Sequence, residues 1–370
     1  MRRLASILIL LAAGCGDDTN PELDAGPAMD ASSGVDAARP DAGPDAALDA
    51  GSDASPGEDA GPAVDSGMPA SGLVGWASVS GLGVDTTTGG GDLSATVVTT
   101  LSELEAAIED TNAAVVRIEG TIEGNVSIGS NKTLEGAPGS TFRGNLTLNG
   151  SVNVILRNLT IVGYNCSDNS DCGSGRDAIT MINSAHHVWF DHCDISDGSD
   201  GNLDITRGSD FVTVSWTRFS YSGMRSGGHQ LSNLVGASDS HTDDDGHLSI
   251  TWHHNWWADN VRERMPRVRF GKNHLFNNLY TSAGNNYCVG LGASGDVLLE
   301  NNVFDGVDDP INSTSYSDGN SVVESRGNLY IDTTGATADR GSGVFTPPYP
   351  YALDDASAVE AMVRAGAGPS

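Results

Sequence analysis

Three aspartates, Asp177, Asp200 and Asp204, are spaced so that they could share a cation. Asp177 comes just before a short apolar run, residues 178–182, and the other two lie close together further along the chain. If short strands coil so that successive turns stack, residues one or two turns apart become neighbours. Carboxylates at close range raise one another's pKa unless a cation neutralises them, and hard oxygen ligands favour Ca²⁺. The alternative is that these aspartates only solvate loop edges.

A basic segment, residues 262–271, interrupts this acidic chain and contains Arg264, Arg267 and Arg269. On a strand, Arg267 and Arg269 would point to one face and Val268 to the other. Arg264 stands just before Met265 and a proline, which places it at a bend or at the start of a strand. Several guanidiniums together can bind a polycarboxylate through bidentate hydrogen bonds. Salt bridges to the abundant Asp and Glu residues are the alternative.

The strands that must position these residues repeat along the chain. Apolar or β-branched runs, each followed by a polar residue that is often Asn, occur at 152–161, 211–216, 248–252, 274–280 and 297–304. The repeats start near residues 187, 211, 248, 272, 296 and 322, so all but one are 24 to 26 residues apart. This period predicts an all-β solenoid, a parallel β-helix in which buried Asn side chains form a hydrogen-bonded ladder.

The exceptions to the repeat predict local features. The single gap of 37 residues predicts an insertion between Ser220 and His247. Two amphipathic stretches, 101–108 and 356–364, predict helices, and the first would cap the open N-terminal end of the solenoid. An antiparallel β-sandwich is disfavoured because its hairpin spacing is not found. Residues 71–370 are therefore expected to form one domain.

The charge of the chain is uneven. The 370 residues carry a net charge of −30, which excludes nucleic acid as a partner because phosphate backbones need cationic surface. Residues 16–70 hold eleven Asp, two Glu and one Arg, seven of the fourteen prolines and no aromatic residue. Such a segment cannot bury enough apolar surface to order itself. It is predicted to be an extended acidic tether, and the alternative is an irregular loop packed on the domain.

The first fifteen residues are typical of an export signal. Arg2 and Arg3 precede an apolar run, residues 4–13, that is too short to span a membrane. The small residues that follow end in Cys15, as in a bacterial lipoprotein signal whose cysteine is lipidated, although Leu11 stands four rather than three residues before it. The protein is expected to be extracellular or anchored to the outer membrane through this lipid alone. Ordinary secretion is the alternative.

Export also fits the other cysteines. Cys166 and Cys172 bracket a short polar loop and could close a disulfide in an oxidising compartment. Cys193 and Cys288 can be buried thiols. A monomer is expected.

Several ordered motifs resemble those of polysaccharide lyase family 1, the pectate lyases. Residues 188–193, Val-Trp-Phe-Asp-His-Cys, are similar to the family's Trp-Ile-Asp-His signature. Residues 200–205 resemble its calcium-ligand segment, and residues 263–271 resemble its catalytic-arginine segment almost residue for residue. The resemblance covers about residues 73–368 and includes these further matches: 87–91, 130–136, 251–255 and the closing segment from Tyr349 onward.

The resemblance implies a right-handed parallel β-helix that cleaves α-1,4-linked polygalacturonate by β-elimination with Ca²⁺. It implies that Asp177, Asp200 and Asp204 bind Ca²⁺. It also implies that Arg264 takes the proton from C5 of the sugar and that Arg269 holds the substrate carboxylate. An arginine base is chemically reasonable only where its surroundings lower the cost of the neutral form. Arg267 is assigned to structure.

One departure from the family pattern matters. The family places a substrate-binding Lys or Arg shortly before a Gly-x-Ser-Asp segment, whereas Gln230 and Leu231 stand before residues 236–239 here. Arg225 or His229 could replace the missing cation. If neither does, the chain could be a surface polyuronate-binding protein with weak or no turnover. A pectin lyase that cleaves methylated substrate without metal is a third possibility, which the three matched aspartates disfavour.

Overall fold

The computed structural model describes residues 72–164, 176–223, 228–313 and 320–370. Five predicted features lie outside these residues: the signal with Cys15, the segment 16–70, Cys166, Cys172 and Arg225.

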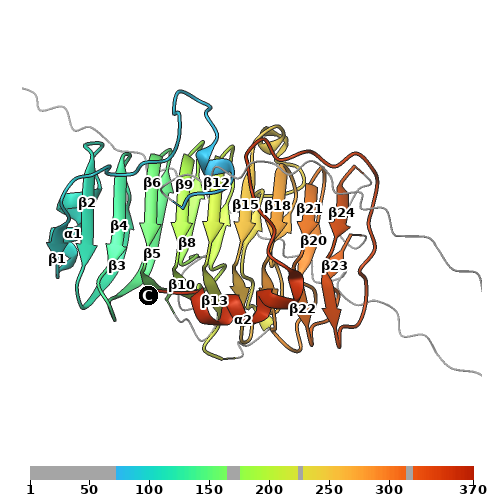
Figure 1. Cartoon of the computed structure of the whole chain (residues 1–370). Coiled ribbons are helices and arrows are strands. Elements are labelled where there is room, and N and C mark those ends of the chain that lie inside the picture. The colour runs from blue at the N-terminus through green and yellow to red at the C-terminus, as the bar shows by residue number, and fades with distance from the viewer. Residues whose placement is uncertain (1–71, 165–175, 224–227, 314–319) are drawn as a thin grey trace, which may run out of the picture. The chain divides into compact units, whose positions relative to one another are not determined.

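A ten-stranded parallel sheet runs the length of the described domain, with its strands side by side in chain order (Figure 1). Its strands are β1 (Thr96–Val98), β2 (Ala114–Ile118), β4 (Lys132–Gly136), β6 (Val152–Arg157), β9 (His186–Asp191), β12 (Asp210–Ser215), β15 (Ile250–His253), β18 (Lys272–Phe276), β21 (Asp296–Glu300) and β24 (Val322–Arg326).

The other strands of the described residues form one fifteen-stranded parallel sheet with two arms. The β7 arm contains β7 (Thr160–Val162), β10 (Asp194–Ser196), β13 (Arg218–Ser220), β16 (Trp256–Trp257), β19 (Leu279–Tyr280), β22 (Val303–Asp305) and β25 (Leu329–Ile331). The β8 arm contains β8 (Ile179–Ile182), β11 (Leu203–Ile205), β14 (Leu234–Val235), β17 (Arg267–Val268), β20 (Val289–Leu291) and β23 (Ile311–Asn312).

The arms meet in one long strand, β5 (Thr141–Asn149), which also pairs with β3 (Thr121–Ser127). The first residues of β5 pair with β7 and its last four with β8. Gly144 lies between the two halves at φ 131°, and a Cβ there would stand 1.9 Å from the carbonyl oxygen of Gly124. Only glycine fits this bend, so β5 directs later turns into two separate arms.

Each complete turn therefore adds one strand to the ten-stranded sheet, one to the β7 arm and one to the β8 arm. The predicted repeat starts fall on β9, β12, β15, β18, β21 and β24, which are consecutive neighbours in the ten-stranded sheet. This confirms the parallel β-helix. The long gap is also confirmed, because more residues separate β13 from β14 and β14 from β15 than separate the equivalent strands of the preceding turn.

The predicted runs 152–161, 274–280 and 297–304 are each two strands rather than one. A corner residue separates the two strands, and it has a left-handed backbone: Asn158 at φ 52°, Asn277 at 52° and Asn301 at 49°. Asparagine tolerates this conformation better than most residues. In these three runs the asparagine thus marks the corner between two sheets, not the interior of a strand.

The predicted asparagine ladder is present just after these corners. The amide of Asn255 donates to Asn278 at 3.1 Å, Asn278 to Asn302 at 2.9 Å and Asn302 to Asn328 at 2.9 Å. Asn278 also donates to the backbone oxygen of Trp252 and accepts from the backbone N–H of Asn255. The ladder satisfies buried polar groups from one turn to the next.

Replacement of Asn278 by alanine is expected to destabilise the domain by about 3 kcal/mol, because it leaves several buried donors and acceptors unpaired. A shift of the urea unfolding midpoint measures this effect. The exposed Asn125 on β3 is the matched control, since its replacement by alanine is expected to change stability by less than about 0.5 kcal/mol. Equal shifts for the two variants would contradict the role of the ladder.

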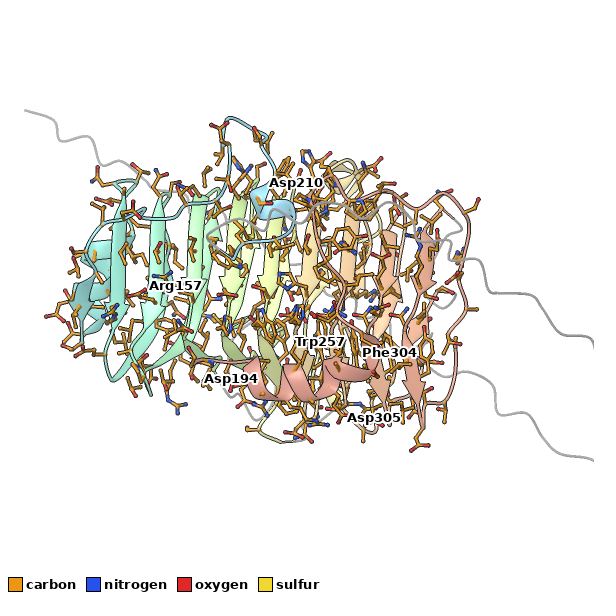
Figure 2. The ribbon with its side chains drawn as sticks, in the orientation of Figure 1. Arg157, Asp194, Asp210, Trp257, Phe304 and Asp305 are labelled. Carbon is orange, nitrogen blue, oxygen red and sulfur yellow. The ribbon has the colours of Figure 1, made fainter. Side chains whose placement is uncertain are left out.

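A stack of aromatic rings fills the interior beside the ladder. Phe219, Trp257, Tyr280, Phe304 and Tyr330 follow one another with ring centroids 4.3 to 5.5 Å apart, and Figure 2 labels Trp257 and Phe304. Aliphatic side chains from the ten-stranded sheet and from both arms complete one continuous core. The core holds successive turns in register, so outward side chains on neighbouring strands keep fixed spacing.

The helices are short. α1 (Leu101–Ile108) forms at the predicted residues, begins with a capping box of Thr100 and Glu103, and packs on β1, β2 and β3. That it serves as a cap stays a prediction. α2 (Ala356–Gly366) covers part of the β7 arm, and η1 (Trp76–Ser78) and η3 (Thr242–Asp244) are single turns (Figure 1). In the described ranges, no helix is long and apolar enough to cross a membrane.

Candidate active site

The β8 arm brings Asp177 and Asp204 to one place on its outer face. Asp204 stands in β11 between Leu203 and Ile205, which are both buried in the core, so its side chain points outward. Asp177 lies just before β8, the neighbouring strand, where Thr180 pairs with Asp204. The two residues are only 6% and 8% exposed. The structure thus brings together two carboxylates that the sequence separates by one turn of the coil.

Gly201 shows how closely these carboxylates approach. A Cβ at this glycine would stand 2.4 Å from Oδ1 of Asp204 and 3.2 Å from Oδ1 of Asp177. Oδ1 of Asp177 is buried and has no hydrogen-bond partner among the described residues. The two oxygens therefore border a small polar cradle above a residue that has no side chain.

The third aspartate, Asp200, lies in the loop between β10 and β11. Its Oδ1 is 3.1 Å from Nε2 of His229, so it faces the imidazole. Within the described residues, no group of three His, Cys, Asp or Glu side chains is arranged as a complete metal site. Two carboxylates border the cradle, and Asp200 stands at its edge.

The surroundings of the three aspartates shift their pKa values in different directions. Burial, together with the charges of Asp204 and Asp200, raises the pKa of Asp177 well above its ordinary value. Burial, followed by the charge of Asp200, raises the pKa of Asp204 to about 7, although Arg264 acts in the opposite direction. The hydrogen bond from His229 lowers the pKa of Asp200. Two buried carboxylates that resist ionisation are a favourable place for a cation.

A pH effect on stability follows from Asp204. Its pKa rises from 3.8 to about 7 on folding, so its contribution to stability is complete below the lower value and is lost as the pH rises through the higher one. Buried histidines such as His253, whose pKa burial lowers, act in the opposite direction. We therefore expect the free energy of unfolding of the calcium-free Asp204→Asn variant to rise relative to that of the parent as the pH is raised from about 5 to about 8. Chemical denaturation at both pH values measures this difference, and a constant difference would contradict it.

Arg264 lies in the loop between β16 and β17, next to the acidic cluster. It has a left-handed backbone at φ 63°, and its carbonyl oxygen accepts from the N–H of Asn233. Burial alone would lower the pKa of Arg264, but the phenol of Tyr287 and the carboxylates of Asp204 and Asp200 raise it above the ordinary value. In the cation-free protein the guanidinium therefore stays charged.

Arg267 in β17 and Arg269 just after it lie on the outer side of the β8 arm, as expected, because Val268 between them is buried in the core. Arg269 is only 2% exposed. Its Nη1 donates to the carbonyl oxygens of Gly236 and Ala237 at 3.0 and 3.1 Å, and its Nε donates to Asp239 at 3.0 Å. The loop 236–249 therefore fixes the plane of this guanidinium.

The structure also shows the residues that stand where the family has a substrate-binding Lys or Arg. Gln230 and Leu231 are both buried, and Leu231 pairs with Glu263 in a parallel bridge. His229 is the candidate replacement that the structure describes, and it reaches the acidic cluster through Asp200. Arg225, the other candidate, lies outside the described residues.

Two side chains at the site, those of Thr180 and Tyr287, belong to none of the sequence motifs. Thr180 donates to Asp177 at 2.8 Å, and Tyr287 lies near Arg264 and raises its pKa. Tyr287 follows Arg264 by about one repeat of the coil, so the period could have placed it on the neighbouring turn. Thr180 could have been found from its strand, because alternate residues of β8 face outward.

The donor set suits a hard cation. The two oxygens that border the cradle are carboxylate oxygens, and Oδ1 of Asp177 is buried without a partner among the described residues, which is the chemistry that Ca²⁺ prefers. Asp177 and Asp204 would hold the ion directly. Asp200 would join them by turning from His229.

Comparisons with known proteins agree with this architecture. A sequence model of the pectate lyase family matches residues 63–370. Pectate lyase E of Dickeya chrysanthemi is 33% identical over 339 residues, which cover 75% of this chain and 84% of that protein.

Solved structures add the same relationship in three dimensions. A pectate lyase variant from Bacillus subtilis is 25% identical and superposes with a TM-score of 0.65. The match covers 80% of this chain and 96% of that protein. A pectate lyase studied for its substrate specificity and anti β-elimination mechanism matches with the same identity, coverage and TM-score. The coil described above is thus the right-handed parallel β-helix. With this agreement in sequence and fold, the chain belongs to the pectate lyase family.

Proposed function

We propose that this polysaccharide lyase cleaves de-esterified polygalacturonate by β-elimination assisted by Ca²⁺. The observation that carries the proposal is the cluster of Asp177, Asp200 and Asp204 on the outer face of the β8 arm, with the half-buried Arg264 close enough to change its acidity. The anti β-elimination of the pectate lyase of similar structure supports the same reaction here.

The substrate explains why such a cluster is useful. The proton at C5 of galacturonate is α to the C6 carboxylate and is weakly acidic. In the elimination, this proton leaves C5, a double bond forms between C4 and C5, and the bond from C4 to the glycosidic oxygen breaks. The departing oxygen takes a proton from water. Negative charge develops on the C6 carboxylate as the C5 proton leaves, so the site must stabilise that charge.

Each site residue has a proposed role in this step. Asp177, Asp200 and Asp204 hold Ca²⁺, which, when bound, stabilises the enolate-like charge on the substrate carboxylate. Arg264 takes the C5 proton. Arg269, with its guanidinium plane fixed by Gly236 and Ala237, orients the substrate carboxylate.

The same contacts explain how Arg264 can act as a base. The carboxylates of Asp204 and Asp200 stabilise its charge in the cation-free protein. Once these carboxylates bind a cation, they no longer stabilise the guanidinium to the same degree, and burial then lowers its pKa. The base is therefore expected to work only in the calcium-loaded enzyme.

A second function is favoured by one observation. Gln230 and Leu231 are buried where the family places a substrate-binding cation, so a protein that binds polyuronate with weak or no turnover is the alternative. We propose that His229 or Arg225 supplies the missing contact instead.

An assay with two substrates separates these functions. We expect ultraviolet absorbance from unsaturated products with polygalacturonate and Ca²⁺, much less with highly methylated pectin, and none with chelator. Product from methylated pectin in the presence of chelator would identify a pectin lyase. Retention of the protein on pectate without product would identify a binding protein.

The location of the enzyme is also proposed. Pectate lyases are typically secreted enzymes, and we propose that Cys15 is lipidated and that residues 16–70 hold the domain away from the cell surface. Release of the Cys15→Ser protein into the medium, with the parent kept in the membrane fraction, supports this anchor. Release of both proteins contradicts it.

A further inference from the structure

A chain of hydrogen bonds leads to Asp177, the more deeply buried of the two cradle carboxylates. Its Oδ2 accepts from the hydroxyl of Thr180 at 2.8 Å. Its Oδ1 is buried without a hydrogen-bond partner among the described residues and borders the cradle at Gly201. One oxygen is thus held by the protein, and the other is directed towards the cradle.

The direction of this hydrogen-bond chain is fixed. Nδ2 of Asn145 lies 2.8 Å from the carbonyl oxygen of Asp177 and 3.2 Å from Oγ1 of Thr180. An amide nitrogen only donates, so Thr180 accepts from Asn145 and has its single proton left for Asp177. The hydroxyl of Thr147 donates to Oδ1 of Asn145 at 2.6 Å and holds the amide in this orientation. Each donor therefore faces an acceptor, and the chain ends on Oδ2 of Asp177.

Paired strands hold the members of the chain in place. Asn145 and Thr147 lie on β5, Thr180 lies on β8, and Thr147 pairs with Thr180 in register. Thr180 in turn pairs with Asp204, the second cradle carboxylate. Ile179 and Met181 are buried in the core, so Thr180 faces outward with Asp204. A group on a packed strand is held more accurately than one on a loop.

We propose that Thr180, oriented by Asn145, is a positioning residue that aims Oδ1 of Asp177 at the cation. The inference rests on the calcium role in the proposed function and deepens it. Without the hydroxyl, the carboxylate of Asp177 can rotate, and the cradle loses a fixed ligand. Partners of this kind commonly change metal affinity by about 10- to 100-fold.

Calcium titration calorimetry on the full chain tests the proposal without measuring catalysis. Thr180→Val keeps the shape and removes the hydroxyl, and we expect it to weaken calcium binding by about 10-fold. Thr180→Ser keeps the hydroxyl and is expected to restore the parent affinity. Thr160→Val, on β7 of the neighbouring arm, is the matched control and is expected to bind calcium as the parent does.

Asn145 provides a second, independent test. Asn145→Ala is expected to weaken calcium binding in the parent and to have a clearly smaller effect in the Thr180→Val background. The part that acts through Thr180 is already lost there, and only the hydrogen bond to the carbonyl oxygen of Asp177 remains to be removed. Fully additive effects of the two changes would overturn the chain.

The outcomes distinguish a failure of the positioning role of Thr180 from a failure of the calcium site itself. Parent-like affinity of Thr180→Val, with a parent-like thermal unfolding midpoint in the absence of calcium, would overturn the positioning role while leaving the calcium site intact. Absence of calcium binding by the parent chain would instead overturn the calcium role in the proposed function.

Discussion

Replacement of Arg264 by alanine is expected to lower kcat on polygalacturonate by about 10³-fold, the size typical of a lost general base. The guanidinium is half-buried beside the acidic cluster, whose carboxylates are assigned to the cation, so Arg264 is the residue left to take the proton. Arg264→Lys keeps a positive charge but changes its shape and reach, so it is also expected to be nearly inactive. Initial rates of unsaturated product formation measure both effects.

Arg262 supplies the matched control for this prediction. It belongs to the same basic segment, but its guanidinium donates to Asn286 at an exposed position. Arg262→Ala is therefore expected to keep most of the activity. Calcium binding by Arg264→Ala should remain measurable, which shows that the fold and the cation site persist. An Arg264→Ala enzyme with activity close to that of the parent would exclude this residue as the base.

Replacement of Asp204 by asparagine is expected to abolish calcium-dependent activity and to weaken calcium binding by about 100-fold or more, since it removes a charged ligand. The amide oxygen can still accept from the N–H of Leu234, which the carboxylate now accepts at 3.1 Å, so the strand pairing is preserved. The same change is expected to stabilise the calcium-free protein near neutral pH, because it removes a buried carboxylate that resists ionisation.

These opposite effects form a signature of a cation site. Thermal unfolding with and without calcium measures both: the variant should start higher and gain less from calcium than the parent. Asp194→Asn is the control, because Asp194, labelled in Figure 2, lies on the β7 arm and pairs with Arg218 at 3.3 Å, whereas the cluster lies on the β8 arm. A variant that is destabilised without calcium and still gains as much from calcium would contradict the assignment.

The sequence predicts the coil well because every turn obeys the same constraint. A corner residue, a buried Asn and an aromatic ring recur with nearly constant spacing, since each must stack on its equivalent in the next turn. The ladder from Asn255 to Asn328 and the ring stack containing Trp257 make this period visible. The corners themselves were missed, because His192 and Trp216 occupy the left-handed conformation without a residue type that signals it.

The candidate site was predicted in part for a similar reason. The positions of Asp177 and Asp204 follow from strand register, because neighbouring turns of a solenoid superimpose. The contact between Asp200 and His229 could not be predicted, since His229 belongs to the insertion, which departs from the repeat. Nor could the directed chain through Asn145 and Thr180, because Asn145 lies on the strand that is shared by both arms.

The proposed enzyme breaks its substrate by elimination and not by hydrolysis. The most direct test counts two products of the same reaction on polygalacturonate with Ca²⁺: new reducing ends and new C4–C5 double bonds. We expect one double bond for each reducing end, and neither product after chelation. Reducing ends without double bonds, or no cleavage at all by the calcium-loaded chain, would contradict it.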